Sequence, residues 1–406
     1  MKKIYEMSLS ERIKFLEKEI GFDLGKKLKK NLKISEAEKL VENVICLYPL
    51  PLGIATNFIV NGKKVYVPMV IEESSVIAAA SNGAKYASYS GGFKASFSKN
   101  ITVGQIQLVS KNPKKTIKKI LSKKSELLEE INRISENMVK RGGGAKNLEA
   151  KNFGKHVVVY IFYDTVDAMG ANTINTICEK IAPVLSDITG CEYRLRIISN
   201  YAIEKIAKSE AIFKKEHVGK DVINGILDAY ELAKLDVRRA VTHNKGIMNG
   251  IDAVAIATGQ DWRAIEAGAH AYACRNGRYQ PLTNWEKNKN GDLVGRIEVP
   301  LQIGTVGGII NIHPIAKISL EIMKVKKVNE LAEIMASVGL ANNFAALRAL
   351  VSEGIQRGHM KLHAINYALS VGAGNLAKEV AKIMIEKNDI SMESAKRILR
   401  ELKKRY

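Results

Sequence analysis

The sequence has few cysteines and few aromatic residues, and both shortages exclude classes of protein. Aromatic residues make up 6% of its 406 residues, and the cysteines include no CxxC pair. The four cysteines lie far apart, at Cys46, Cys178, Cys191 and Cys274. This spacing excludes a disulfide framework and a thiolate zinc site, and it indicates reduced core thiols in a cytoplasmic protein.

Long apolar runs are also missing. Val76–Ala80, Val157–Phe162 and Ile251–Ala257 have the length of strands or core helices, whereas a membrane-spanning helix needs ~18–20 apolar residues. Lys2 and Lys3 are followed by a polar segment and not by the apolar stretch of a signal peptide. We therefore expect no membrane association and a cytoplasmic location.

Positive charge is present in excess. The chain has 63 Lys and Arg against 42 Asp and Glu, a net charge of +21, which favours nucleic acid, an anionic membrane or a phosphate-rich small molecule as partner. The lysines are spread along expected helices, as in Lys114–Lys119, which is typical of solvated helix faces. Because no segment interleaves aromatic and basic residues, we expect no nucleic-acid partner, and nucleic-acid binding stays a minor alternative.

The first hundred residues predict helices and a hairpin. Ser8–Glu11 fits a capping box, so a helix is expected from there to Gly21. A second helix is expected near Ser35–Asn43. Asn61–Gly62 separates two β-rich runs and predicts a hairpin, and the Ala-rich stretch Ser74–Ser88 predicts a buried helix.

Residues 99–199 show a different pattern, in the order strand, helix, strand, strand, helix, strand. The expected elements are Ile101–Val109, Thr116–Ser135, Leu148–Phe153, His156–Tyr163, Ala171–Ile188 and Tyr193–Ser199. This order predicts a small ferredoxin-like (βαββαβ) unit inserted into a larger, mostly helical domain of residues 1–98 and 200–350. The fold class is therefore α+β, with a helical segment at 351–406.

The large domain is expected to resume as a helix over Lys220–His243, with a hairpin near Lys287–Gly291 and helices beyond Pro314. Gly372–Ala377 matches GxGxxA, but a helix and not a strand precedes it, so the dinucleotide fold of that motif is not expected. His359 and His363 have a spacing that metals use, yet no third ligand accompanies them, and we expect no metal.

Two segments combine polar groups in a way that favours chemistry. Glu72 and Glu73 lie between an apolar strand and the Ala-rich helix, where a carboxylate is either a helix-dipole partner or a catalytic acid. Thr242–Gly250 places Lys245 in a polar, glycine-flanked turn, ahead of the apolar run and of Thr258–Arg263. A desolvated lysine beside carboxylates stabilises a developing oxyanion.

These segments resemble the motifs of 3-hydroxy-3-methylglutaryl-coenzyme A (HMG-CoA) reductases, and in particular of the soluble class II enzymes. The matching segments fall in the same order from about residue 8 to about residue 400, and they are Glu42–Ile45, Val70–Ser81, Asp167–Asn172, His243–Gly250, Gly259–Arg263 and Gly354–Met360. The resemblance implies reduction of HMG-CoA to mevalonate and coenzyme A, by two hydride transfers from NAD(P)H through a mevaldyl-CoA or mevaldehyde intermediate. It favours the biosynthetic direction in isoprenoid metabolism.

The resemblance assigns four catalytic residues. Lys245 would stabilise the alkoxide that forms on the substrate, and Asp261 would orient Lys245 and tune its pKa. Glu73 would supply a proton as the aldehyde is reduced. His359 would protonate the departing coenzyme A thiolate.

The resemblance also implies the binding residues. The hydroxymethylglutaryl group would be held by Ser75, Arg239, Thr242, Asn249 and Asn343. Arg239 suits the free carboxylate, because a guanidinium binds a carboxylate with two hydrogen bonds. Asn342 stands where the class usually has Gln, and Arg12 is only a candidate contact for coenzyme A.

The dinucleotide would lie on the small domain. Its expected contacts are Asp167, Ala168, Met169, Gly170, Ala171, Asn172 and Asn200. NADPH and NADH both fit. The segment expected to lie near the ribose contains three lysines, Lys146, Lys151 and Lys155, and a single acidic residue, Glu149, and this composition favours NADPH.

The family forms homodimers with shared active sites, and trimers of dimers are also expected. Residues 351–406 resemble its C-terminal flap, which closes over bound substrate. A catalytically inert acyl-coenzyme A-binding relative stays an alternative to the enzyme.

Overall fold

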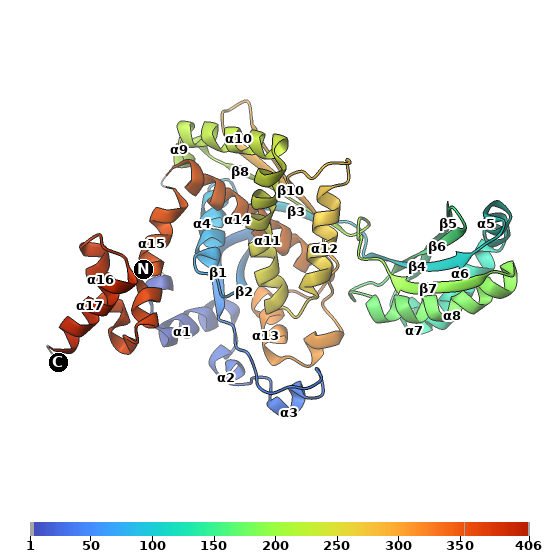
Figure 1. Ribbon diagram of the computed structural model, residues 1–406, viewed down its shortest axis with the longest axis horizontal. Coiled ribbons are helices and arrows are strands. Elements are labelled where there is room, and N and C mark those ends of the chain that lie inside the picture. Colours follow the sequence, from blue (N-terminus) through green and yellow to red (C-terminus); the bar gives the residue numbers. More distant parts are fainter. Residues whose placement is uncertain (1–3, 353, 405–406) are drawn as a thin grey trace.

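Two separate β-sheets organise the chain (Figure 1). The computed structural model describes residues 4–352 and 354–404, and of Tyr5 and residues 355–362 it describes the backbone alone. The larger sheet has the strand order β2-β1-β3-β8-β10-β9. Its strands are β1 (Leu52–Val60), β2 (Lys63–Val70), β3 (Phe93–Phe97), β8 (Ile206–Phe213), β9 (Thr283–Lys287) and β10 (Leu293–Pro300). The two predicted hairpins are its outer pairs, whereas β3 and β8, which join them, were not predicted.

Helix α14 (Val328–Val351) is the centre of the large unit. It packs against α4 (Val76–Ser88), α11 (Val237–Ala257) and the six-stranded sheet, and its Phe344 ring stacks on Phe213 at 3.9 Å. Among the described residues it is the one helix long and apolar enough to cross a membrane, but 72% of that apolar stretch is buried inside the protein. Its composition is that of a core helix.

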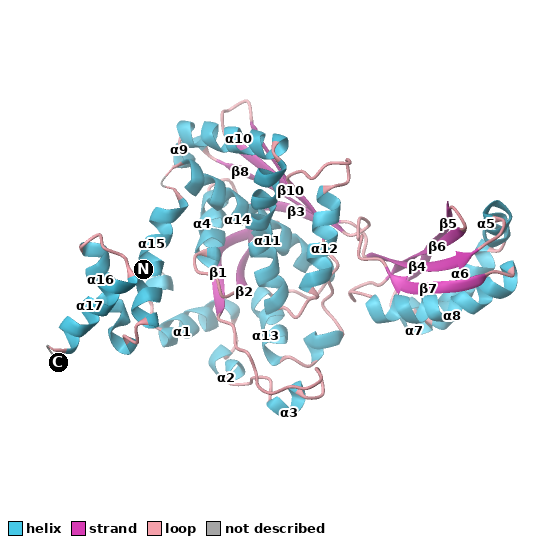
Figure 2. Cartoon of the chain, viewed as in Figure 1, coloured by secondary structure: helices cyan, strands magenta, loops and turns pink. Residues whose placement is uncertain are grey.

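The smaller sheet has the order β5-β6-β4-β7, with every neighbouring pair antiparallel. Its elements are β4 (Ile101–Val109), α5 (Pro113–Ser122), α6 (Lys124–Ile134), α7 (Glu136–Val139), β5 (Gly144–Phe153), β6 (His156–Asp164), α8 (Ala171–Thr189) and β7 (Glu192–Ile198). Figure 2 shows the helices together on one face of the sheet. The ferredoxin-like topology and the α+β class are confirmed, although the expected helix Thr116–Ser135 is interrupted at Lys123.

The structure corrects the prediction around Lys245. The expected helix Lys220–His243 is two helices that meet at Asp236, whose side chain accepts from the N–H groups of Arg238 and Arg239. The second, α11, runs through the predicted turn Thr242–Gly250. Gly250 lies there because α14 comes close: a Cβ on it would stand 3.0 Å from Val338 Cγ1. The other helices of the large unit are α9 (Lys215–Val218), α10 (Lys220–Leu235), α12 (Trp262–Ala273), η2 (Gly308–Asn311) and α13 (Pro314–Met323).

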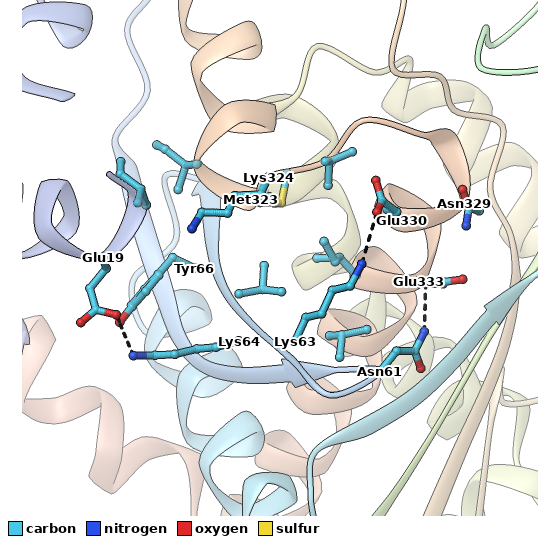
Figure 3. A pocket seen from close by; sticks show the side chains of 16 residues that line it. Glu19, Asn61, Lys63, Lys64, Tyr66, Met323, Lys324, Asn329, Glu330 and Glu333 are labelled. Atoms are coloured by element: carbon cyan, nitrogen blue, oxygen red, sulfur yellow. Dashed lines mark hydrogen bonds and ion pairs between the residues drawn. The ribbon is translucent and has the colours of Figure 1, made fainter. Parts of the chain in front are cut away.

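The N-terminal helices are η1 (Ile4–Glu6), α1 (Leu9–Ile20), α2 (Leu24–Leu28) and α3 (Ile34–Ala37). Of these, α1 and α2 share an apolar cluster with Tyr66 of the outer strand β2 and with Ile318 and Ile322 of α13. The capping box at Ser8 and the stop at Gly21 are confirmed, but the helix expected over Ser35–Asn43 ends at Ala37 because the chain turns. Figure 3 shows Glu19 accepting from Lys64 and from the Tyr66 hydroxyl, each at 2.8 Å, beside a cavity of about 460 Å³ that none of the predicted site residues lines.

The C-terminal helices form a separate cluster, on the far side of the large unit from the small sheet (Figure 1). They are α15 (Ile355–Ser370), η3 (Gly374–Leu376), α16 (Ala377–Glu386) and α17 (Met392–Lys403). They share an apolar core that includes Ala364, Val380 and Ile398. Gly354, at φ 78°, joins this cluster to the large unit after α14.

All four cysteines are free thiols. Cys178 and Cys191 are buried as predicted. The prediction of core thiols is wrong for Cys46 and Cys274, which are exposed, because one lies in the segment after α3 and the other at the end of α12.

We predict that Gly83→Ala destabilises the fold by about 1–3 kcal/mol or more, because the new Cβ overpacks the α4–α14 crossing. It would stand 2.2 Å from the carbonyl oxygen of Ala341. Chemical denaturation measures the loss. Gly25→Ala is the control, since its Cβ would meet nothing nearer than Glu17 Oε1 at 3.4 Å, and it should be neutral or slightly stabilising. Equal effects of the two substitutions would contradict the packing argument.

Candidate active site

The structure brings Glu73 and Lys245 together. Lys245 Nζ lies 2.9 Å from Glu73 Oε2, and the side chains are 60% and 41% exposed, respectively. An ion pair this open to solvent stabilises a fold very little. It leaves an ammonium and a carboxyl group, from segments 172 residues apart, within reach of a substrate.

The loop between β2 and α4 positions Glu73. Within the described residues Glu73 makes no capping bond to α4, so its observed partner is Lys245 and not the helix. Ser75 follows at φ 77°, a left-handed conformation that is uncommon for a residue with a side chain. Its hydroxyl does not cap α4 either. Such local strain often accompanies functional sites, and here it turns the chain sharply just after the carboxylate.

Helix α11 presents four of the predicted residues on one face. Arg239, Thr242, Lys245 and Asn249 are spaced so that the helical repeat of 3.6 residues keeps them within about a third of a turn. Arg239 is half-buried, and burial lowers the pKa of its guanidinium, which stays charged at any physiological pH. Thr242 donates to the carbonyl of Arg238. The face therefore combines two cations with hydroxyl and amide groups, which suits an anionic, hydroxylated substrate.

Asn343 lies behind this face and not on it. Its Oδ1 accepts from Thr283 Oγ1 at 3.1 Å and from Trp285 Nε1 at 2.8 Å, and its Nδ2 donates to the His243 carbonyl. The structure thus does not bring Asn343 to Lys245. The neighbouring Asn342 is also buried, and its amide packs against Gly250.

The same network fixes the protonation of His243. Thr283 gives its only hydrogen to Asn343, so the 2.6 Å contact to His243 must be donated by Nε2. Burial lowers the pKa of His243 to about 3, which keeps the ring neutral. A neutral imidazole inside α11 leaves the positive charge of the face to Arg239 and Lys245.

Two of the predicted catalytic residues are not joined to the pair. Asp261 caps α12 by accepting from Ala264 N at 3.1 Å, and it pairs with Arg263 at 3.3 Å. Within the described residues no contact joins Asp261 to Lys245. His359 falls in α15, and its side chain lies outside the described residues.

The segment Asp167–Asn172 joins β6 to α8 and is anchored on the large unit. Asp167 accepts at its carbonyl from Thr305 N at 2.8 Å and at Oδ1 from Val328 N at 2.9 Å. Just before it, Val166 has φ 53°, an outlier for a β-branched residue. Its N–H donates to Asp164 Oδ1 and its carbonyl accepts from Asn100. The loop is therefore held rigidly on both sides.

This segment fits a pyrophosphate. Gly170 is the N-cap residue of α8, at φ 100°, and a Cβ on it would stand 2.4 Å from Thr165 Cγ2, so only glycine is accommodated. No acceptor in the described part of the chain pairs with the N–H groups of residues 170–173. Free N–H groups at the start of a helix bind anionic groups. Asn200 lies exposed two residues beyond β7.

Sequence reasoning missed three polar groups near these segments. Gln260 accepts at Oε1 from Gly304 N at 2.9 Å, and Lys205 is fully buried beside Met169. Asp252 faces Glu266, and Glu266 in turn contacts His270 at 2.6 Å. Two of them had a usable signal: Gln260 lies within the matching segment Gly259–Arg263, and Asp252 lies seven residues, or two helical turns, after Lys245.

Comparisons with known proteins agree on one family. A family model described as hydroxymethylglutaryl-coenzyme A reductase matches residues 8–364. The 3-hydroxy-3-methylglutaryl-coenzyme A reductase of Archaeoglobus fulgidus is 46% identical, over 98% of this chain and 94% of that protein.

Solved structures give the same result. The reductase from Streptococcus pneumoniae superposes with a TM-score of 0.84 at 39% identity, over 98% of this chain and 99% of that one. A second structure from that organism is described as the class II reductase bound to NADPH in open conformations. It gives a TM-score of 0.83 at 40% identity, over 86% of this chain and 99% of that chain.

The Asp252–Glu266 pair predicts how stability depends on pH. Burial and the facing carboxylate raise the pKa of Asp252 to about 9, above its value of about 3.9 in an unfolded chain. Stability from this group is complete below pH ~4 and is lost as pH rises towards 9, at up to about 1.4 kcal/mol per pH unit. The free energy of unfolding of Asp252→Asn, measured by urea denaturation, should therefore increase relative to that of wild type as the pH rises from 5 to 9. Exposed Asp228→Asn is the control, and a pH-independent difference for Asp252→Asn would refute the prediction.

Proposed function

The chain belongs to the hydroxymethylglutaryl-coenzyme A reductase family, and from that membership we propose that it reduces HMG-CoA to mevalonate and coenzyme A in the biosynthetic direction. The observation that supports this best is the 2.9 Å contact between Lys245 and Glu73, open to solvent at the head of α4. The reaction needs two hydrides and two protons. A nicotinamide cofactor supplies the hydrides.

Each proton has a donor among the proposed residues. In the first reduction, the thioester carbonyl becomes a hemithioacetal, and the Lys245 ammonium stabilises the alkoxide oxygen. The C–S bond then breaks, and His359 protonates the coenzyme A thiolate. In the second reduction, the aldehyde oxygen takes a proton from Glu73. Glu73 must therefore be protonated at that step. Its contact with Lys245 supports this role, because the carboxyl would then lie beside the oxygen that Lys245 stabilises.

The α11 face suits the rest of the substrate. Arg239 is the partner for the free carboxylate of the hydroxymethylglutaryl group, with Ser75, Thr242 and Asn249 around its hydroxyl. Neither Asp261 nor Asn343 contacts Lys245 in the single chain. We therefore propose that Asp261 orients Lys245, and that Asn343 contacts the substrate, only after substrate binding and subunit assembly complete the site.

A homodimer with shared sites accounts for an exposed apolar segment. Residues 41–48 extend along the surface, and Ile45 and Tyr48 are 94% and 85% exposed. Next to them lies a mostly apolar cavity of about 850 Å³ that includes Leu47 and His313. Apolar surface of this extent is typical of protein–protein contacts. Assembly into trimers of dimers and a cytoplasmic location stay predictions.

The two ligands are assigned to the units built on the two sheets. We propose that residues 1–98 and 200–350 bind the acyl-coenzyme A, that residues 99–199 bind the dinucleotide, and that residues 351–406 close as a flap that delivers His359. NADPH is the proposed cofactor. In support, Lys146 lies beside Asp164 at the end of β6, next to the dinucleotide segment, and a relative 40% identical is described as bound to NADPH.

We predict that wild type oxidises NADPH faster than NADH in the presence of HMG-CoA and forms mevalonate. Lys245→Ala and Glu73→Gln should each lower kcat by about 10²–10⁴-fold while HMG-CoA still binds, because each removes a group that acts on the transition state. The assay follows absorbance at the nicotinamide band, with mevalonate identified by mass spectrometry.

The matched control is Lys220→Ala, an exposed lysine at the start of α10, which should keep wild-type activity. If wild type binds HMG-CoA but consumes neither cofactor, the protein is an inert acyl-coenzyme A binder and the proposal is wrong. Salt-sensitive retention on a DNA column without reductase activity would instead favour the nucleic-acid alternative.

A further inference from the structure

Lys205 is a fully buried lysine, with none of its surface exposed. It stands directly before β8, and its Nζ donates to the Met169 carbonyl at 2.9 Å. Burying an ammonium is costly unless other groups compensate it. The charged groups that face it are Asp164, at the end of β6, and Glu204, which precedes it in the chain. Within the described residues neither forms an ion pair with Lys205.

The bond to Met169 lies directly behind the free N–H groups of α8. The Met169 carbonyl also accepts from Thr102 Oγ1 at 3.1 Å, and the next residue, Gly170, is the N-cap of the helix. From the other side, Gly304 approaches so closely that a Cβ on it would stand 2.4 Å from Met169 N. Lys205 accepts at its own carbonyl from Leu301 N at 2.9 Å. The lysine thus connects the 301–304 segment to the start of α8.

We propose that Lys205 is a positioning residue for the dinucleotide. It holds the Met169 carbonyl so that the N–H groups of residues 170–173 converge on the pyrophosphate, and it takes up a proton when that anion binds. The inference rests on the proposed function, since it requires that the dinucleotide binds at Asp167–Asn172.

The electrostatics of the free protein support proton uptake. Burial lowers the pKa of Lys205 to about 7, against the opposing effect of Asp164 and Glu204. Much of the protein therefore has a neutral lysine at pH 8. A pyrophosphate bound at the adjacent helix start favours the charged form and raises the pKa. Uptake should be large near pH 8 and small at pH 6, where the free protein already holds the proton.

Glu204 is the other buried group near Lys205 that can take up a proton when the dinucleotide binds. Burial raises the pKa of its carboxyl, with Glu149 adding to the effect and Lys151 opposing it. A Glu204→Gln variant removes the competing carboxyl and leaves Lys205 in place.

Calorimetric titration with NADPH at pH 6 and pH 8, each in two buffers of different ionisation enthalpy, measures the protons taken up. Wild type and Glu204→Gln should take up roughly half a proton or more at pH 8 beyond what Lys205→Met takes up. The subtraction cancels the 2′-phosphate of NADPH, which titrates near pH 6. The Kd of wild type should rise up to about tenfold from pH 6 to pH 8, relative to Lys205→Met. Lys208→Met, on the exposed face of β8, should behave as wild type.

The inference is overturned if Lys205→Met binds NADPH with the same Kd, pH dependence and proton uptake as wild type. If wild type binds no dinucleotide, the proposed function has failed instead. Should Lys205→Met not fold, NMR of wild type labelled at lysine Cε decides the matter. The Lys205 signal should titrate near pH 7 in the free protein and at least one pH unit higher with NADPH bound. The same titration in both states would refute the coupling.

Discussion

The close packing of α14 against α4 and α11 is the constraint on which the proposed site depends. Gly83 lets the backbone of Ala341 approach α4, and Gly250 and Gly339 let α11 and α14 approach each other. The loop ahead of α4 holds Glu73 and the middle of α11 holds Lys245, so the crossing of these helices sets the distance between carboxyl and ammonium. The close packing of the helix backbones at these glycines therefore determines the geometry of the Glu73–Lys245 pair. The pair itself contributes little to the stability of the fold.

A second set of contacts relates that pair to the dinucleotide segment. Gln260, beside Asp261, accepts from Gly304, and Thr305 donates to Asp167. The segment 301–306 is therefore bonded both to the start of α12 and to the loop before α8. Hydride transfer requires the nicotinamide and the thioester to be held at a fixed distance and orientation. The hydrogen bonds donated by the backbone of this segment connect the two units at the point where the ligands would meet.

Local signals made much of the fold predictable. The capping box at Ser8, the Asn61–Gly62 turn and the alternation along β6 each specify an element through nearby residues. The prediction that Lys245 lies in a turn was wrong. The glycines around it lie where α11 packs against α14, a helix that is distant in sequence. The Glu73–Lys245 contact joins segments 172 residues apart, and only resemblance to a family pointed to it. Lys205 gave no signal, since a lysine beside a strand is ordinarily exposed.

The central claim is that one site reduces a thioester twice, and the stoichiometry of the reaction tests it most directly. With limiting HMG-CoA and excess NADPH, the loss of nicotinamide absorbance and the appearance of free coenzyme A thiol are followed in the same sample. The account predicts two NADPH oxidised for each thiol released. One NADPH per thiol would mean that the aldehyde leaves before the second reduction, and thiol without NADPH oxidation would mean hydrolysis. Either result would contradict the account.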